Sequence, residues 1–160
     1  MRIGITGHMN LTPETIDLVQ AAISEALQAH QSDDLVGLSC LAVGADSIFA
    51  QAILDAGAKL TVVVSSADYR DKKVNPEDQP AYDFLLSQAA EVNAMPFDTG
   101  GREAYAAANE HILTSIDHLF AVWDGQLSAA KGGTADAVAQ AQARGIPVTI
   151  IWPTGAERVA

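Results

Sequence analysis

Apolar positions along the chain fall into two alternating patterns. Short runs of almost uninterrupted apolar or small residues, typical of strands covered on both faces, occupy positions 2–6, 35–43, 59–64, 94–97, 118–124 and 146–152. Longer segments, in which apolar residues recur every three or four positions, predict helices at 13–30, 46–57, 81–91, 102–117 and 135–144. This alternation predicts an α/β fold: a single Rossmann-like, doubly wound domain over 1–160, with a mainly parallel sheet flanked by helices.

The segment 67–80 is the longest stretch without a periodic pattern, and two prolines frame its end. Loops of this length in compact domains are typically lids or binding loops. Tyr69 could stack on a nucleobase there, and Arg70 could contact a phosphate. The alternative is a solvated, charged loop without a binding role.

Small and polar residues follow three of the predicted strands, where a parallel sheet presents its ligand crevice. They are Thr6, Gly7 and His8; Gly44, Ala45 and Asp46; and Asp124, followed by Gly132, Gly133 and Thr134. Glycines let the backbone turn tightly with free N–H groups, and Thr134 would cap the last helix, so this helix start suits a phosphate or carboxylate. We therefore predict a site for a nucleotide-sized anion, unless the glycines serve only the turn.

Two further residues are candidates for the same site. Ser66 closes the third strand, and Asn109 places an amide on the apolar stripe of the helix at 102–117, where it needs partners from backbone or ligand. Asp46 has two compatible interpretations, as the N-cap of the second helix or as an acceptor for a ribose hydroxyl. His111 and His118 lack the companions of a metal site, so we predict no metal and identify no cofactor.

Charge is the property of the composition that bears most on the choice of partner. Nine Lys and Arg against 20 Asp and Glu give a formal net charge of −11, so duplex nucleic acid is not expected as a partner. A small anion is not excluded, because glycine-turn amides act locally. The single Cys40 precludes an intrachain disulfide, and no apolar run approaches the ~18 residues of a membrane span. We expect a cytoplasmic protein without a membrane partner.

Three groups of residues carry a resemblance to a known family. They are the motif Gly-Ile-Thr-Gly-His at 4–8, the motif Ala-Val-Gly-Ala-Asp at 42–46, and the segments 117–125, 132–134 and 143–148. In this order they resemble the superfamily that joins the Smf/DNA-processing-protein-A Rossmann domain to the Lonely-Guy proteins, often called SLOG, over nearly the whole chain. The resemblance implies that the glycine-bearing strand exits bind a nucleotide or a nucleotide-derived small molecule.

The resemblance does not carry an enzymatic activity with it. Lonely-Guy phosphoribohydrolases have the pattern Pro-Gly-Gly-x-Gly-Thr-x-x-Glu with a catalytic glutamate, and alignment on Gly133 and Thr134 puts Ala137 at that glutamate. The C-terminal half also resembles nucleoside 2-deoxyribosyltransferases, whose nucleophilic glutamate follows the threonine, where this chain has Asp136. The carboxylates that other loops could supply are Asp98, Glu103 and Asp124.

Three functions therefore stay open. The chain could be a non-catalytic domain that binds or senses a nucleotide-like ligand, with the phosphate on the turn at 132–134. It could be a hydrolase or transferase acting on the N-glycosidic bond of nucleosides or their monophosphates. It could also be a structural module that pairs with a second copy through apolar helix faces, its glycine turns being purely structural.

Overall fold

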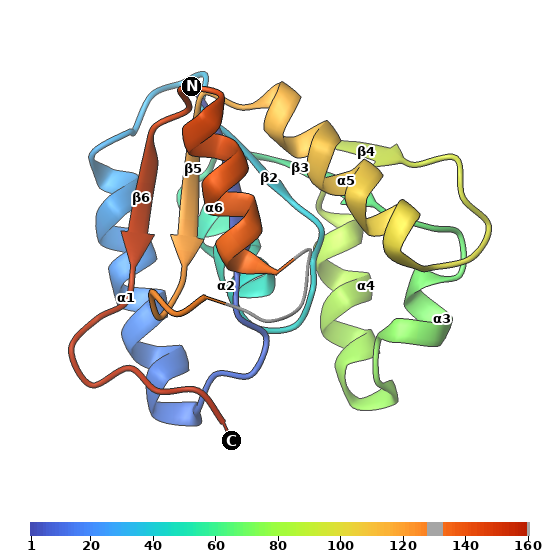
Figure 1. Ribbon diagram of the computed structural model, residues 1–160, viewed down its shortest axis with the longest axis horizontal. Coiled ribbons are helices and arrows are strands. Elements are labelled where there is room, and N and C mark those ends of the chain that lie inside the picture. The colour runs from blue at the N-terminus through green and yellow to red at the C-terminus, as the bar shows by residue number, and fades with distance from the viewer. Residues whose placement is uncertain (128–132, 160) are drawn as a thin grey trace.

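The chain folds around one six-stranded sheet in which every pairing is parallel, as Figure 1 shows. The computed structural model describes residues 1–127 and 133–159. The strands are β1 (Arg2–Gly7), β2 (Val36–Ser39), β3 (Lys59–Val64), β4 (Glu91–Ala94), β5 (His118–Val122) and β6 (Val148–Ile151). Their order in the sheet is β4-β3-β2-β1-β5-β6. This arrangement confirms the predicted α/β, Rossmann-like fold.

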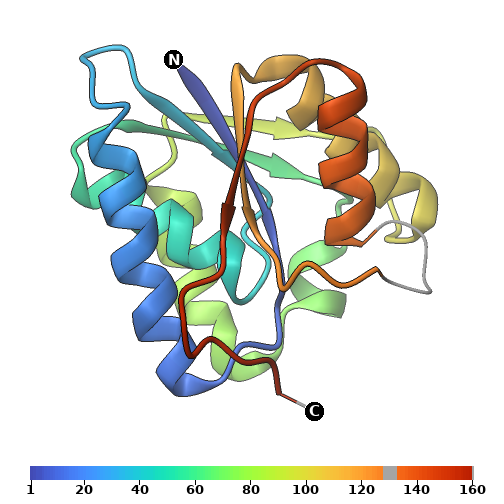
Figure 2. The same ribbon diagram turned by 60° about the vertical axis from the view of Figure 1, so that its left-hand side comes forward.

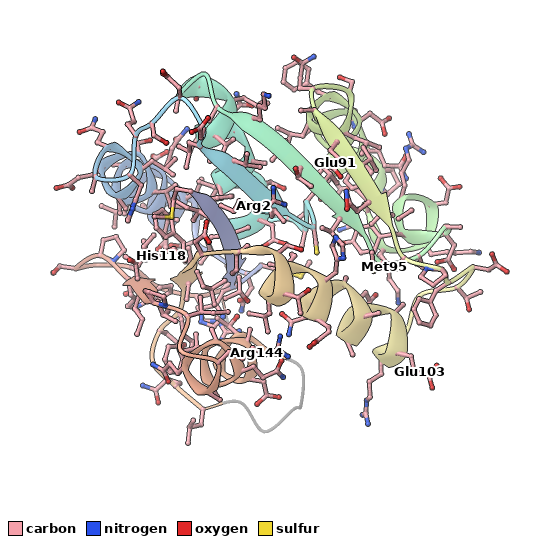
Figure 3. All side chains as sticks on the ribbon, turned by 90° about the horizontal axis from the view of Figure 1, so that it is seen from above. Arg2, Glu91, Met95, Glu103, His118 and Arg144 are labelled. Atoms are coloured by element: carbon pink, nitrogen blue, oxygen red, sulfur yellow. The ribbon has the colours of Figure 1, made fainter. Side chains whose placement is uncertain are left out.

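Helices cover both faces of the sheet. One face carries α1 (Pro13–Gln28), α2 (Ala45–Asp55) and α4 (Gln79–Ser87), and the other carries α5 (Arg102–Ser115) and α6 (Thr134–Ala143), as seen from above in Figure 3. Two short pieces, α3 (Tyr69–Lys73) and the 3₁₀ turn η1 (Pro76–Asp78), lead into α4. No helix among the described residues is long and apolar enough to cross a membrane.

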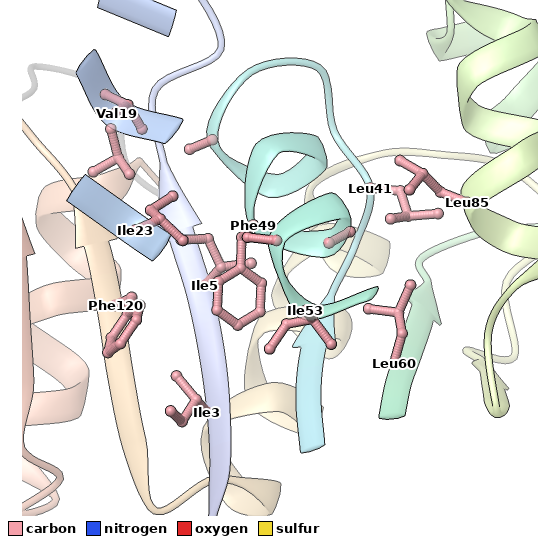
Figure 4. Packing of buried hydrophobic residues seen from close by; sticks show 14 of the residues in the cluster. Ile3, Ile5, Val19, Ile23, Leu41, Phe49, Ile53, Leu60, Leu85 and Phe120 are labelled. Atoms are coloured by element: carbon pink, nitrogen blue, oxygen red, sulfur yellow. The ribbon is translucent and has the colours of Figure 1, made fainter. Parts of the chain in front are cut away.

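The larger core lies between the sheet and the face that carries α1, α2 and α4. Figure 4 shows Phe49 of α2 packed among the aliphatic side chains of the central strands. The Phe49 ring meets Phe120 of β5 edge to face, with the ring centroids 5.9 Å apart. Both rings are fully buried, so this layer fixes α2 against β1 and β5 and thereby positions the start of α2 at the sheet edge.

The chain changes direction between β1 and β5. From β1 it winds outward through β2 and β3 to β4, and α5 then brings it back to β5, beside β1. The helices that follow β1 and β5 lie on opposite faces of the sheet, which leaves a crevice at the carboxyl ends of these two strands. The predicted ligand site therefore lies at the point where this fold type places ligands.

Three predicted boundaries differ from the structure. The strand expected at 35–43 ends at Ser39, because Leu41 adopts a left-handed backbone with φ 59° and turns the chain out of the sheet. The segment 67–80 is not an irregular loop, since it contains α3, η1 and the start of α4. The fourth strand lies at 91–94 rather than 94–97, paired with β3.

The C-terminal segment 153–159 runs back across the start of α1, as Figure 2 shows. Leu11 and Arg158 form an antiparallel bridge, and the Val159 N–H donates to the Asn10 carbonyl at 2.7 Å. The Glu157 N–H donates to the buried Thr15 Oγ1, also at 2.7 Å. This segment thus fastens the loop after β1.

Candidate functional site

A pocket of about 460 Å³ opens at the carboxyl ends of β1, β2 and β3, under α3, α5 and α6. It brings together seven residues that the sequence analysis selected, and its size falls in the range of small-molecule sites. These seven are Thr6, Gly7, Asp46, Tyr69, Asn109, Gly133 and Thr134. Segments distant in sequence thus meet in one hollow.

Asp46 supplies the carboxylate of the pocket. It lies in the first turn of α2, although Gly44 rather than Asp46 takes the N-cap position. Its Oδ2 accepts a long hydrogen bond of 3.4 Å from the Ala42 N–H, and no Lys, Arg or His of the described chain lies within ion-pair distance. Burial raises the pKa of Asp46 to about 7. The carboxyl group can therefore be present in either protonation state near neutral pH.

Ser65 places a buried, unpaired hydroxyl group in the described lining of the pocket. Its side chain is 4% exposed and lines the pocket, yet its hydroxyl has no hydrogen-bond partner within the described part of the chain. Buried hydroxyls almost always have a partner, since leaving one unpaired costs about 1–3 kcal/mol. A ligand atom would remove that cost.

The predicted neighbour, Ser66, is not in the pocket lining. Its hydroxyl donates to Asp68 Oδ1 at 2.7 Å, and the same oxygen accepts the Gly100 N–H at 2.8 Å. Ser66 therefore fastens the loop before α5. Consecutive residues at the end of a strand point to opposite sides, so a choice between Ser65 and Ser66 required the register of β3.

Aromatic and cationic side chains form the rim. Tyr69 and Lys73 come from α3, and Tyr105 comes from α5. Burial raises the pKa of the Tyr69 phenol, and the neighbouring Asp46 and Cys40 raise it further, so these groups lie close enough to interact. Burial and Asp46 likewise raise the pKa of the Cys40 thiol, which keeps it neutral.

Sequence reasoning missed several lining residues because each had a simpler interpretation. Cys40 lies in an apolar run, Lys73 in the charged segment 67–80 and Tyr105 on the apolar stripe of the helix at 102–117, so none of them gave a local signal of a site. Tyr105 is in fact 42% exposed. Only the sheet order, which puts α3 and α5 at the same edge, could have grouped them.

The start of α6 forms another wall of the pocket. Gly133 takes the N-cap position, without a side-chain cap, and Thr134 is the first helical residue, contrary to the expectation that Thr134 caps the helix. Gly133, Thr134 and Ala137 face the pocket. The helix has ten residues, and its first N–H groups carry partial positive charge. Gly132 lies outside the described residues.

Side-chain contacts hold α6 against α5. The Asn109 Nδ2 donates to Gln140 Oε1 at 3.1 Å, and Arg144 forms an ion pair with Glu110. Asn109 therefore has a partner in α6 and also faces the pocket. The sequence left open whether this amide bonds to protein or lines the site, and in the structure it does both.

His8 and Asp124, also predicted for the site, lie outside the pocket lining. The Asp124 N–H donates to His8 Nε2 at 3.1 Å, and the Asp124 carboxylate lies 3.4 Å from the Arg158 guanidinium. Burial lowers the pKa of His8, and Arg158 lowers it further. The Trp152 ring packs edge-on against the His8 ring at 5.7 Å. This group holds the C-terminal segment.

Gly44 and Ala45 serve close packing rather than the pocket lining. Gly44 has a φ of +94°, and a Cβ there would lie 2.6 Å from the His8 carbonyl oxygen. A Cβ on Gly7 would lie 2.5 Å from the Ala45 Cβ. These small residues let the start of α2 approach the end of β1, which brings Asp46 to the pocket.

The carboxylates considered for catalysis do not line the pocket. Asp98 and Glu103 are exposed and, like Asp124, lie outside the pocket lining. Asp46 is thus the carboxylate that the described lining offers, and Ala137 lines the pocket as a methyl group. Within residues 1–127 and 133–159, no three His, Cys, Asp or Glu side chains are grouped as a metal site.

No protein-family model matches the chain, and no curated protein matches its sequence. Solved structures do resemble it. DNA processing protein A from Streptococcus pneumoniae has a TM-score of 0.68 at 16% identity, over 96% of this chain and 51% of that protein. The chain thus spans about half the length of that neighbour.

Two further structures show the same architecture. DNA processing protein A from Helicobacter pylori has a TM-score of 0.67 at 15% identity, over 99% of this chain and 68% of that one. The structural-genomics target TM1055 has a TM-score of 0.57 at 15% identity, over 92% and 71%. At such identities the likeness is one of fold, and at that level it confirms the resemblance to the DNA-processing-protein-A domain.

These comparisons correct the partner expectation, which excluded duplex nucleic acid and did not consider single strands. The H. pylori protein is described by its single-stranded DNA binding mode, so this fold is compatible with such a partner. The charge argument assumed a duplex lying against a broad basic face. A single strand can instead be held by local amides and aromatic rings, which a net charge of −11 does not forbid.

Proposed function

We propose that the pocket binds a nucleotide, either free or as one unit of a single strand. The phosphate lies at the start of α6, and the base enters between Tyr69 and Tyr105. The observation that carries this proposal is the unpartnered Ser65 hydroxyl in a pocket at the carboxyl ends of parallel strands. Such a pocket at a topological switch point is the usual ligand position in open α/β sheets.

The start of α6 supports the phosphate position. Gly133 brings backbone N–H groups to the pocket without a side chain that would occupy them. A helix of this length stabilises a nearby anion through its N–H groups and dipole. Lys73 on the opposite rim adds a positive charge to the same hollow.

The structural neighbours support the ligand class. Proteins with this fold include one described as binding single-stranded DNA and another named for DNA processing. Both ligand forms, a free nucleotide and a single strand, present one phosphate, one sugar and one base to a pocket of this size. The shared unit is therefore what we propose as ligand.

Titration calorimetry with the four ribonucleoside monophosphates and a single-stranded pentanucleotide tests this. We expect binding of at least one mononucleotide, and a stronger interaction with the pentanucleotide if the natural ligand is a strand. Inorganic phosphate should bind more weakly than the mononucleotides, since it leaves Ser65 and the tyrosines unused. Absence of binding by every nucleotide and by the pentanucleotide would refute the proposal.

Gly133→Asp tests the phosphate position. An aspartate at the N-cap would place its own carboxylate on the free N–H groups, so the helix is capped while the phosphate is repelled. We expect nucleotide affinity to fall at least tenfold with no loss of melting temperature. The matched control is Gly133→Asn, which caps the same N–H groups without charge and should lose clearly less affinity than Gly133→Asp. Equal nucleotide affinities of these two variants would show that the phosphate does not lie at the start of α6.

The second candidate function is cleavage of an N-glycosidic bond, and Asp46 is the observation that favours it. A carboxyl group with a pKa near 7 could donate a proton to the departing base while water adds to the anomeric carbon of the sugar. Chromatography of protein incubated with nucleoside monophosphates would then show free base, and Asp46→Asn would abolish it. Binding without base release supports the non-catalytic function.

A further inference from the structure

The Asp46 carboxylate lacks hydrogen-bond donors. An ionised carboxylate accepts about four hydrogen bonds, but Asp46 receives one long bond, from Ala42. Ile5, Ala108 and Ile112 contribute apolar surface to the same pocket. A charge in such surroundings needs donors, and the described chain does not supply them. In the proposed complex, these donors come from the ligand.

The position of Asp46 in the sheet indicates which part of a nucleotide meets it. The phosphate at the start of α6 lies beside β1, whose Thr6 and Gly7 share this wall. Asp46 follows β2, and Ser65 follows β3. Strands are spaced ~4.8 Å apart, so the ribose lies over β1 and β2 and the base extends toward β3. Asp46 and Ser65 then face the edge of the base.

We infer that the pocket prefers guanine, whose N1–H and N2–H groups donate to the Asp46 carboxylate while the Ser65 hydroxyl donates to O6. This inference rests on the proposed nucleotide site. Guanine presents two adjacent N–H donors beside a carbonyl, which matches a carboxylate beside a hydroxyl. Adenine offers one amino donor next to the N1 lone pair, which an ionised carboxylate repels.

The preference depends on pH. Cys40 and Tyr69, which border Asp46, stay neutral because burial raises the pKa of each, and Lys73 and Tyr105 complete the set of titratable groups in the pocket lining. Above pH 8 Asp46 is ionised and accepts both guanine donors. Below pH 6 it is protonated and offers one donor and one acceptor, the complement of the adenine edge. The ratio of guanine to adenine affinity should therefore fall as pH decreases.

Calorimetry at pH 8 with GMP, AMP, IMP and dGMP tests the assignment. We expect GMP to bind at least tenfold more tightly than AMP. IMP lacks the N2 amino group and should bind more weakly than GMP, whereas dGMP should match GMP. If Asp46 instead held the ribose, dGMP would lose affinity and all bases would bind alike, which would overturn the inference.

Two variants separate this inference from the proposed function. Asp46→Asn should lower GMP affinity at least tenfold while AMP affinity is kept or rises, because the amide offers the adenine edge one donor and one acceptor. Ser65→Ala should lower GMP affinity about threefold or more. The matched control is Asp55→Asn, an exposed aspartate at the far end of the same helix, which should change neither affinity. Equal loss for both nucleotides in Asp46→Asn overturns base recognition but keeps the nucleotide site. Failure of every nucleotide to bind refutes the site itself.

Discussion

At the scale of single residues, the chemistry of the pocket depends on two side chains that are poorly satisfied without a ligand. Asp46 was predictable because it follows a glycine exit at a strand end. Ser65 was not, because its neighbour Ser66 has the same chemistry and the sequence does not give the register. The glycines predicted for the anion site have two different roles, and no local sequence motif distinguishes them. Gly133 lines the pocket, whereas Gly44 allows close packing.

Asp46 should also make stability depend on pH. Its pKa is about 7 in the folded state against 3.8 as the ordinary value, so the folded protein binds the extra proton between these pH values. Stability is therefore full below about pH 4 and decreases as pH rises toward 7. Each unit of pKa shift corresponds to about 1.4 kcal/mol.

Denaturant unfolding of the wild type and Asp46→Asn at pH 5 and pH 8 measures this effect. Relative to the wild type, the variant should gain about 1–3 kcal/mol between these two pH values. Asp55→Asn serves as control and should track the wild type at both. A constant difference between Asp46→Asn and the wild type would mean that the carboxyl group titrates normally.

At the scale of elements, periodic helices were predictable and short pieces were not. The helices α1, α2 and α5 appear close to their expected positions because each buries a continuous apolar stripe. The five-residue α3 is too short to show a period, so it was interpreted as loop although it brings Tyr69 and Lys73 to the pocket. The strand β2 was extended too far because the apolar run continues past the turn at Leu41.

The attachment of the C-terminal segment to α1 gives a prediction at this scale. Thr15→Val keeps the shape of a buried side chain but removes the acceptor of the Glu157 N–H and the hydroxyl that pairs with Thr12 Oγ1. We expect a loss of about 1–2 kcal/mol in unfolding free energy. Thr114→Val, whose exposed hydroxyl bonds only to carbonyls of its own helix, should cost less than about 0.5 kcal/mol. Equal effects would show that the attachment contributes little.

At the scale of the whole molecule, the alternation of elements was enough to predict a parallel sheet. It did not give the strand order, which decides that α3, α5 and α6 meet over β1, β2 and β3. Bulk charge was the least informative property. It averages over a surface on which one small hollow carries the N–H groups of α6 and the Lys73 ammonium, and it led to a partner expectation that considered nucleic acid only as a duplex.

A site with one phosphate position should show a weak dependence on salt. For single strands, log K falls with log salt with a slope of about −0.7 for each neutralised phosphate. Pentanucleotide affinity should therefore decrease only about threefold between 50 and 200 mM salt. Fluorescence anisotropy with a labelled strand measures this slope. A decrease of a hundredfold would instead indicate a basic surface that contacts many phosphates.

Leu41 has a consequence for how a ligand enters. It is buried in a left-handed backbone, with its N–H held by Ser39 Oγ at 3.1 Å, and its neighbours Cys40 and Ala42 line the pocket. Such a conformation costs about 1–2 kcal/mol. This cost is part of the free energy of folding and not of ligand binding. That wall is preorganised, whereas the exposed Lys73 has a long side chain that can adjust as a ligand enters.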